Sequence, residues 1–185
     1  MSAYNCVIQF WFQGADDSVI IDKNRPPFNI WFGFNEQFDQ RIKEKFKIDI
    51  QKAKNGDYQE WKEAPEGRLA LILMFDQFTR NIYRRTPKMY ENDSLALALA
   101  NDTIGLKLDE QLPLLYRVFI YMPLMHAEDL RIQKLSVEKF ERLYFLSKTK
   151  CPLNTAYYLY HLNFARKFLT QIEENGHFLH RTKSD

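Results

Sequence analysis

Residues 76–81 (DQFTRN) bring acidic, basic and amide side chains together at helical spacing. Asp76 and Arg80 are four residues apart, as are Gln77 and Asn81, so in a helix all four would lie within about 140° of one face. A guanidinium on such a face can hold a carboxylate or phosphate through two parallel hydrogen bonds. The same spacing also fits an ordinary ion pair on a solvated helix face. The residues alone leave both interpretations open.

Arg117 is a second cationic candidate, because it lies within an almost wholly apolar stretch, LLYRVFIY. A guanidinium stays charged, so its burial requires a carboxylate partner, and Asp76, Glu128 and Asp129 are the candidates. Tyr121 in the same stretch is a further candidate for ligand binding. Alternatively, the side chain of Arg117 reaches out of an edge helix into water.

A histidine and two acids follow in the segment 126–129 (HAED). His126 and Asp129 are three residues apart and can share a helix face, an arrangement that suits an acid–base pair or two metal ligands. No second histidine lies at ligand spacing and no cysteine cluster is present, so we predict no metal. Alternatively, Glu128 and Asp129 only stabilise the start of a helix, where the helix dipole favours acids.

Two kinds of function fit these residues. The sequence has no nucleophile elbow, Walker loop, dinucleotide fingerprint or Cys-x-x-Cys pair, so it indicates no cofactor. We expect a binding module whose pocket takes a small anionic molecule or a peptide, with the ligand-binding candidates Asp76, Gln77, Arg80, Asn81, Arg117, Tyr121, His126 and Glu128. The alternative is an enzyme with Arg80 and Arg117 as an anion clamp and with the catalytic candidates His126, Glu128 and Asp76. A buried polar network that only locks helices together is a third interpretation.

Helical periodicity dominates the elements that must position these side chains. Glycine and proline fall between the periodic segments, and no stretch alternates apolar and polar residues as strands do. We predict an all-α fold in a single domain, residues 1–185, with about eight helices packed as antiparallel hairpins. The expected helices span about residues 3–13, 35–55, 66–85, 87–105, 110–122, 125–148 and 154–174, with a short helix around Trp61.

Local signals predict several boundaries of these elements. Residues 16–33 are expected to form a loop, because Asp-Asp, Asn-Arg and Pro-Pro cluster there. Asp57 and Glu60 resemble a capping box that opens the short helix around Trp61. Thr86 followed by a proline resembles an N-cap with proline at the first helical position.

Apolar patterns distinguish a surface helix from a central one. The helix over 35–55 shows a single apolar stripe, and Gly56 can provide its left-handed cap; the stripe consists of Phe38, Ile42, Phe46, Ile50 and Ala53. The helix over 66–85 is apolar nearly all round in its first half, which is typical of a central helix. Pro123 is expected to break the helix that precedes it.

Composition limits the partners and the compartment. The chain has 185 residues, a net charge of +2 and interleaved acids and bases, so it offers no concentrated basic patch and we expect no nucleic-acid partner. The longest apolar run, 69–75, is far shorter than the roughly 20 residues that span a bilayer, so we expect no membrane partner. The two cysteines form no disulfide framework and residues 1–14 lack signal-peptide features, which indicates a soluble cytoplasmic protein. Nothing in the sequence sets the oligomeric state.

Motifs spread over most of the chain occur in the order of a known family. They run from 7–12 (VIQFWF) through 67–72 (GRLALI) to the most specific ones, 76–81 and 117–129 (RVFIYMPLMHAED). These motifs resemble the bacterial family catalogued as domain of unknown function 924. The resemblance implies an all-α fold similar to tetratricopeptide-type helical hairpins, and it implies no established activity. It also implies that the polar residues of the family pattern are those described above.

The sequence departs from that family at several positions. Thr79 stands where the family usually has proline, and Ala127 stands where it usually has serine. The family's basic aromatic tail is only echoed in residues 176–182 (GHFLHRT), with changes at His177, Leu179 and Thr182. We interpret residues 180–181 (HR) as part of an exposed tail.

Overall fold

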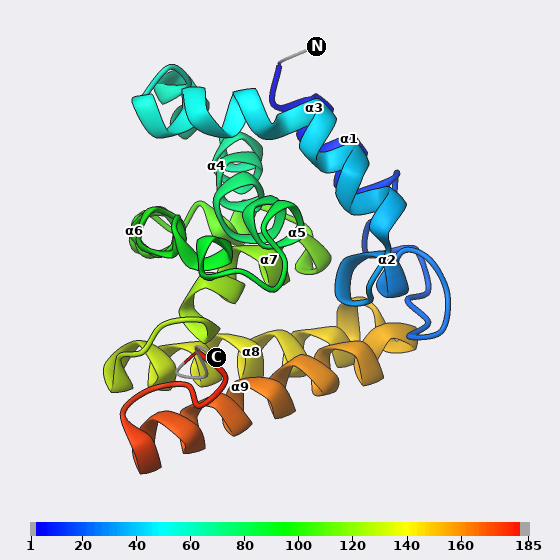
Figure 1. Ribbon diagram of the computed structural model, residues 1–185. Helices are drawn as coiled ribbons and strands as arrows, with labels where there is room; N and C mark the ends of the chain where they lie inside the picture. The colour runs from blue at the N-terminus through cyan, green and yellow to red at the C-terminus, as the bar shows by residue number, and fades with distance from the viewer. Residues whose placement is uncertain (1–2, 182–185) are drawn as a thin grey trace.

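The computed structural model describes residues 3–181, and every regular element among them is helical (Figure 1). The all-α class is therefore confirmed, whereas tetratricopeptide-like stacking of the hairpins stays a prediction. The α-helices are α1 (Asn5–Phe12), α2 (Phe28–Phe32), α3 (Glu36–Asn55), α4 (Pro65–Leu73), α5 (Thr79–Ile82), α6 (Asp93–Gly105), α7 (Leu114–Met125), α8 (Leu130–Lys150) and α9 (Thr155–Asn175).

Helix α4 lies at the centre of the described part of the chain. It contacts α1, α6 and α7, and its residues 67–73 are all buried, as expected for a helix that is apolar nearly all round. Helices α8 and α9 lie side by side as an antiparallel pair, with α7 packed against both (Figure 1). Helix α7 therefore joins the centre of the molecule to this pair.

Aromatic side chains fill the core beside α4. The side chain of Trp11 is fully buried, and the rings of Trp31, Phe78 and Phe119 pack around it with centroids 5.5 to 6.5 Å away. The indole Nε1 of Trp31 donates a hydrogen bond of 2.8 Å to the Trp11 carbonyl. Because each aromatic side chain buries a large area, this cluster anchors α1 and α2 to the central helices.

The prediction for α3 is confirmed in detail. Asn35 is its N-cap, and its side-chain oxygen accepts a hydrogen bond from the Phe38 amide at 2.9 Å. Gly56 is its C-cap with φ of 89°, a left-handed conformation that favours glycine. The whole predicted stripe is buried, namely Phe38, Ile42, Phe46, Ile50 and Ala53.

The segment 66–85, predicted as one helix, contains a wider turn. Helix α4 passes into a π-helical turn, Met74–Phe78, which continues into α5. The backbone N–H of Thr79 donates to the Met74 carbonyl five residues back, and the Thr79 hydroxyl donates to the same carbonyl at 3.0 Å. Apolar periodicity could not predict this turn, because nearly every face of the segment is buried.

Residues 16–33 are not wholly a loop, contrary to the prediction. The end of this range forms α2, because Phe28 and Trp31 bury their side chains there. Helix α2 is only five residues long, so its apolar pattern is too short to stand out against the turn-forming residues before it.

Two predicted helix starts differ from the structure. The capping box at Asp57 is not formed: the Asp57 amide donates to the Lys52 carbonyl at the end of α3, and the next element is a 3-10 helix (Gln59–Glu63) without a side-chain cap. Thr86 does stand at an N-cap position with proline at the start of the next helical turn, as predicted, but its hydroxyl donates back to the Tyr83 carbonyl and that turn is a 3-10 helix (Pro87–Tyr90). A short 3-10 helix then precedes α6, which begins only at residue 93.

Pro123 lies inside α7 and does not break it, contrary to the prediction. The missing N–H of Pro123 removes one helical hydrogen bond, the one to the Phe119 carbonyl, and only Leu124 and Met125 follow, so just a short end of α7 lies beyond the interruption.

Helix α8 begins at Leu130 and not near residue 125 as predicted. Asp129 is its N-cap, because one carboxylate oxygen accepts hydrogen bonds from the amides of Arg131 at 2.8 Å and Ile132 at 3.1 Å. The interpretation of Asp129 as a helix-capping acid is therefore confirmed.

No helix within residues 3–181 is long and apolar enough to cross a membrane. Thr182, the last changed position of the tail, lies outside the described residues. The single domain and the cytoplasmic location stay predictions.

Candidate functional site

The Asp76 carboxylate lies at the centre of the candidate site and is almost fully buried. Arg80 Nη1 donates to Asp76 Oδ1 at 2.6 Å, and Nδ1 of His126 lies 2.7 Å from the same oxygen. Gln77 Nε2 donates to the second carboxylate oxygen, Oδ2, at 2.6 Å. The structure therefore brings four predicted site residues together, three from the central helical segment and one from the end of α7.

Asp76 is charged in this setting. Burial by itself would raise the pKa of Asp76, but the positive charges of Arg80 and His126 and the hydrogen bonds from His126 and Gln77 outweigh it. The pKa of Asp76 is therefore held well below its usual range. A buried carboxylate needs such partners, because an unpaired buried charge is very costly.

The π-helical turn, Met74–Phe78, contains both Asp76 and Gln77. Such turns occur frequently at functional sites, where the extra residue redirects side chains. Gln77 uses its position to contact Met122 of α7 as well, with its Nε2 3.3 Å from the Met122 sulfur. The turn thus aims two neighbouring side chains at the same end of α7.

Arg80 connects Asp76 to a second acid that sequence reasoning missed. Its guanidinium lies 2.8 Å from Asp93 Oδ1 and donates to Asp93 Oδ2 at 3.0 Å. Arg80 is the bridge between the central segment and the start of α6. The pKa of Arg80 is raised, because its two carboxylate partners outweigh the effect of burial.

Arg181 is not part of an exposed tail, contrary to the sequence interpretation. After α9 the chain turns back toward the start of α8 (Figure 1), and Arg181 Nη2 donates to Asp93 Oδ2 at 3.1 Å and to the His126 carbonyl at 2.9 Å. The guanidinium also lies 4.3 Å from the ring centroid of Tyr90. The echo of the family tail was the one sequence signal that could have indicated this contact.

Glu128 holds the tail segment and does not line the site. Its carboxylate accepts a hydrogen bond of 2.8 Å from the Phe178 amide. His126 and Asp129 do not share a helix face, because His126 ends α7 and Asp129 caps α8. An acid–base pair of those two residues is therefore not formed.

Arg117 and Tyr121 lie in a different place from the other predicted site residues. The guanidinium of Arg117 donates to the backbone carbonyls of Glu110 at 2.7 Å and Leu112 at 2.8 Å, and none of the three predicted carboxylates is its partner. The carbonyls before α7 satisfy the buried cation because its side chain folds back along its own chain segment. The Tyr121 hydroxyl donates to Asp109 at 2.5 Å, and burial followed by this hydrogen bond raises its pKa.

Asn81 also turns away from the Asp76 carboxylate. Its amide donates to Asp39 of α3 at 2.5 Å, and Arg84 Nε donates to the same carboxylate group at 2.7 Å. These contacts fasten α5 to α3. The polar face predicted for residues 76–81 is therefore divided between two neighbours.

A recess of about 340 Å³ opens beside the Asp76 network. Its polar lining consists of Gln77, Arg80, His126 and His161. Its apolar lining comes from α2, α7 and α9 and consists of Phe32, Met122, Met125, Tyr160, Phe164 and Phe168. The lining thus combines a few polar and cationic side chains with a larger number of aromatic and methionine side chains.

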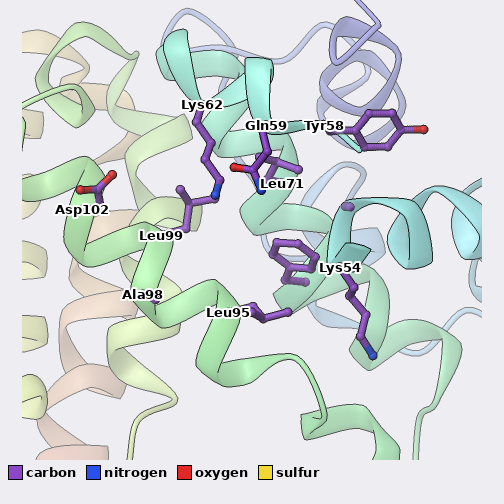
Figure 2. A pocket seen from close by; sticks show the side chains of 11 residues that line it. Lys54, Tyr58, Gln59, Lys62, Leu71, Leu95, Ala98, Leu99 and Asp102 are labelled. Atoms are coloured by element: carbon purple, nitrogen blue, oxygen red, sulfur yellow. The ribbon is translucent and has the colours of Figure 1, made fainter. Parts of the chain in front are cut away.

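A second recess, of about 290 Å³, is lined by residues of α3, α4 and α6 (Figure 2). Lys54, Lys62 and Asp102 are among its polar residues, and Asp102 is already paired with Arg68 at 2.5 Å. Its lining contains none of the predicted site residues. Among the described residues, it also contains no buried polar side-chain atom that lacks a partner. The first recess is therefore the better candidate site.

Metal-binding groups do not gather in the described part of the chain. Within residues 3–181, no three side chains of histidine, cysteine, aspartate or glutamate lie where they could hold one ion. In the Asp76 network, the groups that face the carboxylate are cationic or amide donors.

The fold and site define an all-helical protein with a buried Asp–His pair beside an aromatic recess. The family model described as bacterial protein of unknown function (DUF924) matches residues 7–184, so the chain belongs to this family. It is similar to the solved structure of a protein of unknown function from Agrobacterium tumefaciens, with 29% identity and a TM-score of 0.72 over 96% of this chain and 86% of that one. No curated protein matches the chain.

Proposed function

We propose that the recess beside Asp76 and His126 binds a small molecule through an anionic group. The observation that carries this proposal is the lining, in which Arg80 and His126 occur together with aromatic and methionine side chains. Its volume falls near the lower end of the range of small-molecule pockets, roughly 300 to 1,000 Å³, and this favours a small molecule over a peptide.

His126 is the side chain that meets the anionic group. The Asp76 carboxylate fixes the ring of His126 and favours a proton on Nδ1. Among the described residues, Nε2 of His126 has no hydrogen-bond partner, so this nitrogen is free to donate to a ligand when the ring is protonated. Arg80 strengthens the positive potential there, but its guanidinium is shared by Asp76 and Asp93, so it does not act as a free clamp.

A binding experiment with two plain carboxylates tests this proposal. Phenylacetate and 3-phenylpropionate are titrated into the protein by calorimetry, with phenylacetamide as the uncharged control. The His126→Asn variant is expected to lose at least about tenfold in affinity, because it removes a charge-assisted hydrogen bond. The matched control is His177→Asn, since His177 lies outside the recess. Binding that is equal in wild type and His126→Asn, or absent in wild type, contradicts the proposal.

A second candidate function is hydrolysis in the same recess. It is favoured by the 2.7 Å contact between Asp76 and Nδ1 of His126, because an acid that orients a histidine leaves the other nitrogen as a general base. His126 Nε2 would take a proton from water as its oxygen attacks an ester carbonyl. Release of 4-nitrophenol from 4-nitrophenyl phenylacetate, lost in both His126→Asn and Asp76→Asn, would support this function. Binding of the carboxylate probes without release of 4-nitrophenol would support only the binding function.

A further inference from the structure

His161 is a second histidine of the recess, and its setting is apolar. It lies on α9 and is 2% exposed. Aromatic rings surround it, with centroid distances of 4.6 Å to Tyr157, 5.1 Å to Phe32 and 5.3 Å to Tyr160. It nevertheless lines the recess together with His126. The two histidines thus occupy a charged and an apolar part of one cavity.

Nε2 of His161 is buried and has no hydrogen-bond partner among the described residues. Leaving a buried polar atom unpaired costs about 1–3 kcal/mol, so such atoms are few in folded proteins. The Tyr157 hydroxyl is also unpaired, but Tyr157 does not line the recess. Among the residues that line the recess, His161 is therefore the one with a buried polar side-chain atom that lacks a partner in the described part of the chain.

The charge state of His161 limits what it can bind. Burial lowers the pKa of His161 to about 3, so the ring is neutral near pH 7 and offers no charge to an anion. A neutral imidazole nitrogen can accept or donate a hydrogen bond, depending on the tautomer. A hydroxyl group suits either case, because it can also do both.

The apolar side chains that line the recess indicate the body of the ligand. Met122 and Met125 of α7 line it together with Phe164 and Phe168 of α9. Aromatic and thioether side chains pack well against the face and edge of a flat ring.

We infer, building on the proposed function, that the ligand is an aromatic carboxylate with a hydroxyl group on its ring. The carboxylate binds at His126, and the ring hydroxyl binds to His161 Nε2. His161 is therefore the residue that determines specificity, and His126 supplies the general affinity for the anion.

Matched probes test the role of His161. Phenylacetate and 3-phenylpropionate are each compared with their 3-hydroxyphenyl and 4-hydroxyphenyl counterparts by calorimetry. At least one hydroxylated probe is expected to bind about threefold to tenfold more tightly than its plain partner, the value of one uncharged hydrogen bond. In His161→Phe this gain disappears, so that the ratio of the affinities for a hydroxylated probe and its plain partner falls to about one. In His126→Asn both members of a pair weaken together.

A measurement on the wild-type chain keeps the test independent of how the variants fold. The ring nitrogen of His161 is followed by ¹⁵N NMR, and it is expected to shift with a hydroxylated probe and not with its plain partner. If plain and hydroxylated probes bind equally in a His126-dependent way, the inference about His161 is wrong and the proposed function stands. If no probe binds, both are wrong.

Discussion

Arg80 and Arg117 are both largely buried arginines on neighbouring helical segments, yet they are satisfied in different ways. Arg117 donates to two backbone carbonyls within seven residues of itself, Glu110 and Leu112. Arg80 is paired with Asp76 and Asp93, two carboxylates from different segments, and the tail reaches the same Asp93 through Arg181. Arg117 supports its own chain segment, whereas Arg80 joins the central segment to the start of α6, and Arg181 brings the tail to the same carboxylate.

This difference separates a structural arginine from one at a candidate site. The surroundings of Arg117 are closed, since its guanidinium donates to two backbone carbonyls and the nearby Tyr121 hydroxyl donates to Asp109. The surroundings of Arg80 include a recess, and Nε2 of His161 in the lining of that recess is buried without a partner among the described residues. Polar groups that lack a protein partner beside a mostly apolar cavity are typical of a ligand site, because a ligand can pair with them.

Removal of the central carboxylate is expected to have the largest effect. Asp76→Ala leaves the charges of Arg80 and His126 without their shared partner, at a cost of about 3–5 kcal/mol in free energy of unfolding. Urea unfolding at pH 7 measures this loss, because the lowered pKa of Asp76 means that its contribution is lost only as the pH falls below about 4. The control, Glu141→Ala, breaks an exposed pair and should cost less than about 1 kcal/mol. A loss for Asp76→Ala as small as that of the control would show that the network contributes little.

Substitution of Arg117 tests the other region, in which the arginine supports only the structure. Arg117→Met keeps most of the apolar stem but leaves the carbonyls of Glu110 and Leu112 unpaired, at a cost of about 2–3 kcal/mol. Affinity for phenylacetate per folded molecule should stay within twofold of wild type. A selective loss of affinity, measured where the variant is fully folded, would place Arg117 in the site after all.

The pH dependence of the free energy of unfolding distinguishes the two regions, and the expected effect is about 2 kcal/mol. His161 takes up a proton near pH 6.5 when the chain is unfolded but only near pH 3 when it is folded, because burial lowers its pKa. The unfolded state then binds more protons between these values, so stability falls as the pH falls through this window. When the pH is lowered from 7.5 to 5, the free energy of unfolding of His161→Phe should fall by roughly 2 kcal/mol less than that of the wild type. Parallel curves for the two proteins would mean that His161 is not buried as described.

The smallest effect is expected at the tail. Arg181→Ala removes a partly exposed pair with Asp93 and a hydrogen bond to the His126 carbonyl, so its cost should be about 1 kcal/mol or less. Hydrogen exchange at the Phe178 amide, which donates to Glu128, should become faster while the amides of α4 are unchanged. Unchanged exchange at Phe178 would show that the tail is held without Arg181.

Much of the fold could be predicted because it follows from local patterns. The stripe of α3, its glycine cap and the burial of the helix over 67–73 need only helical periodicity. The errors lie where tertiary contacts override local signals. Helix α2 exists because Phe28 and Trp31 reach a distant core, and Pro123 is tolerated because it falls in the last turn of α7.

The site was predicted in part for the same reason. The Asp76–Arg80 pair is four residues apart and could be read from spacing, whereas His126 meets Asp76 only through the packing of α7 against the central segment. Asp93 and Arg181 were missed because no spacing rule joins residues so far apart in sequence. Arg117 was wrongly expected to need a carboxylate, since backbone carbonyls are present next to any arginine and leave no mark in a sequence.

Thr79 holds the end of the π-helical turn through two hydrogen bonds. Its amide and its hydroxyl both donate to the Met74 carbonyl. The hydroxyl also accepts a hydrogen bond from Asn92 Nδ2 at 2.9 Å, just before α6. Thr79 thus ties the turn to a neighbouring segment.

Because the turn at Met74–Phe78 is widened, the site also depends on the number of residues in this segment. Deleting one residue there would restore a regular α-helical turn, which needs one residue fewer, so the segment after it would keep its orientation. Asp76 and Gln77 would change direction within the turn, and Asp76 would lose its alignment with Arg80 and His126, although every charged side chain would still be present. The count of residues between Leu73 and Arg80 is therefore constrained as strictly as their identities.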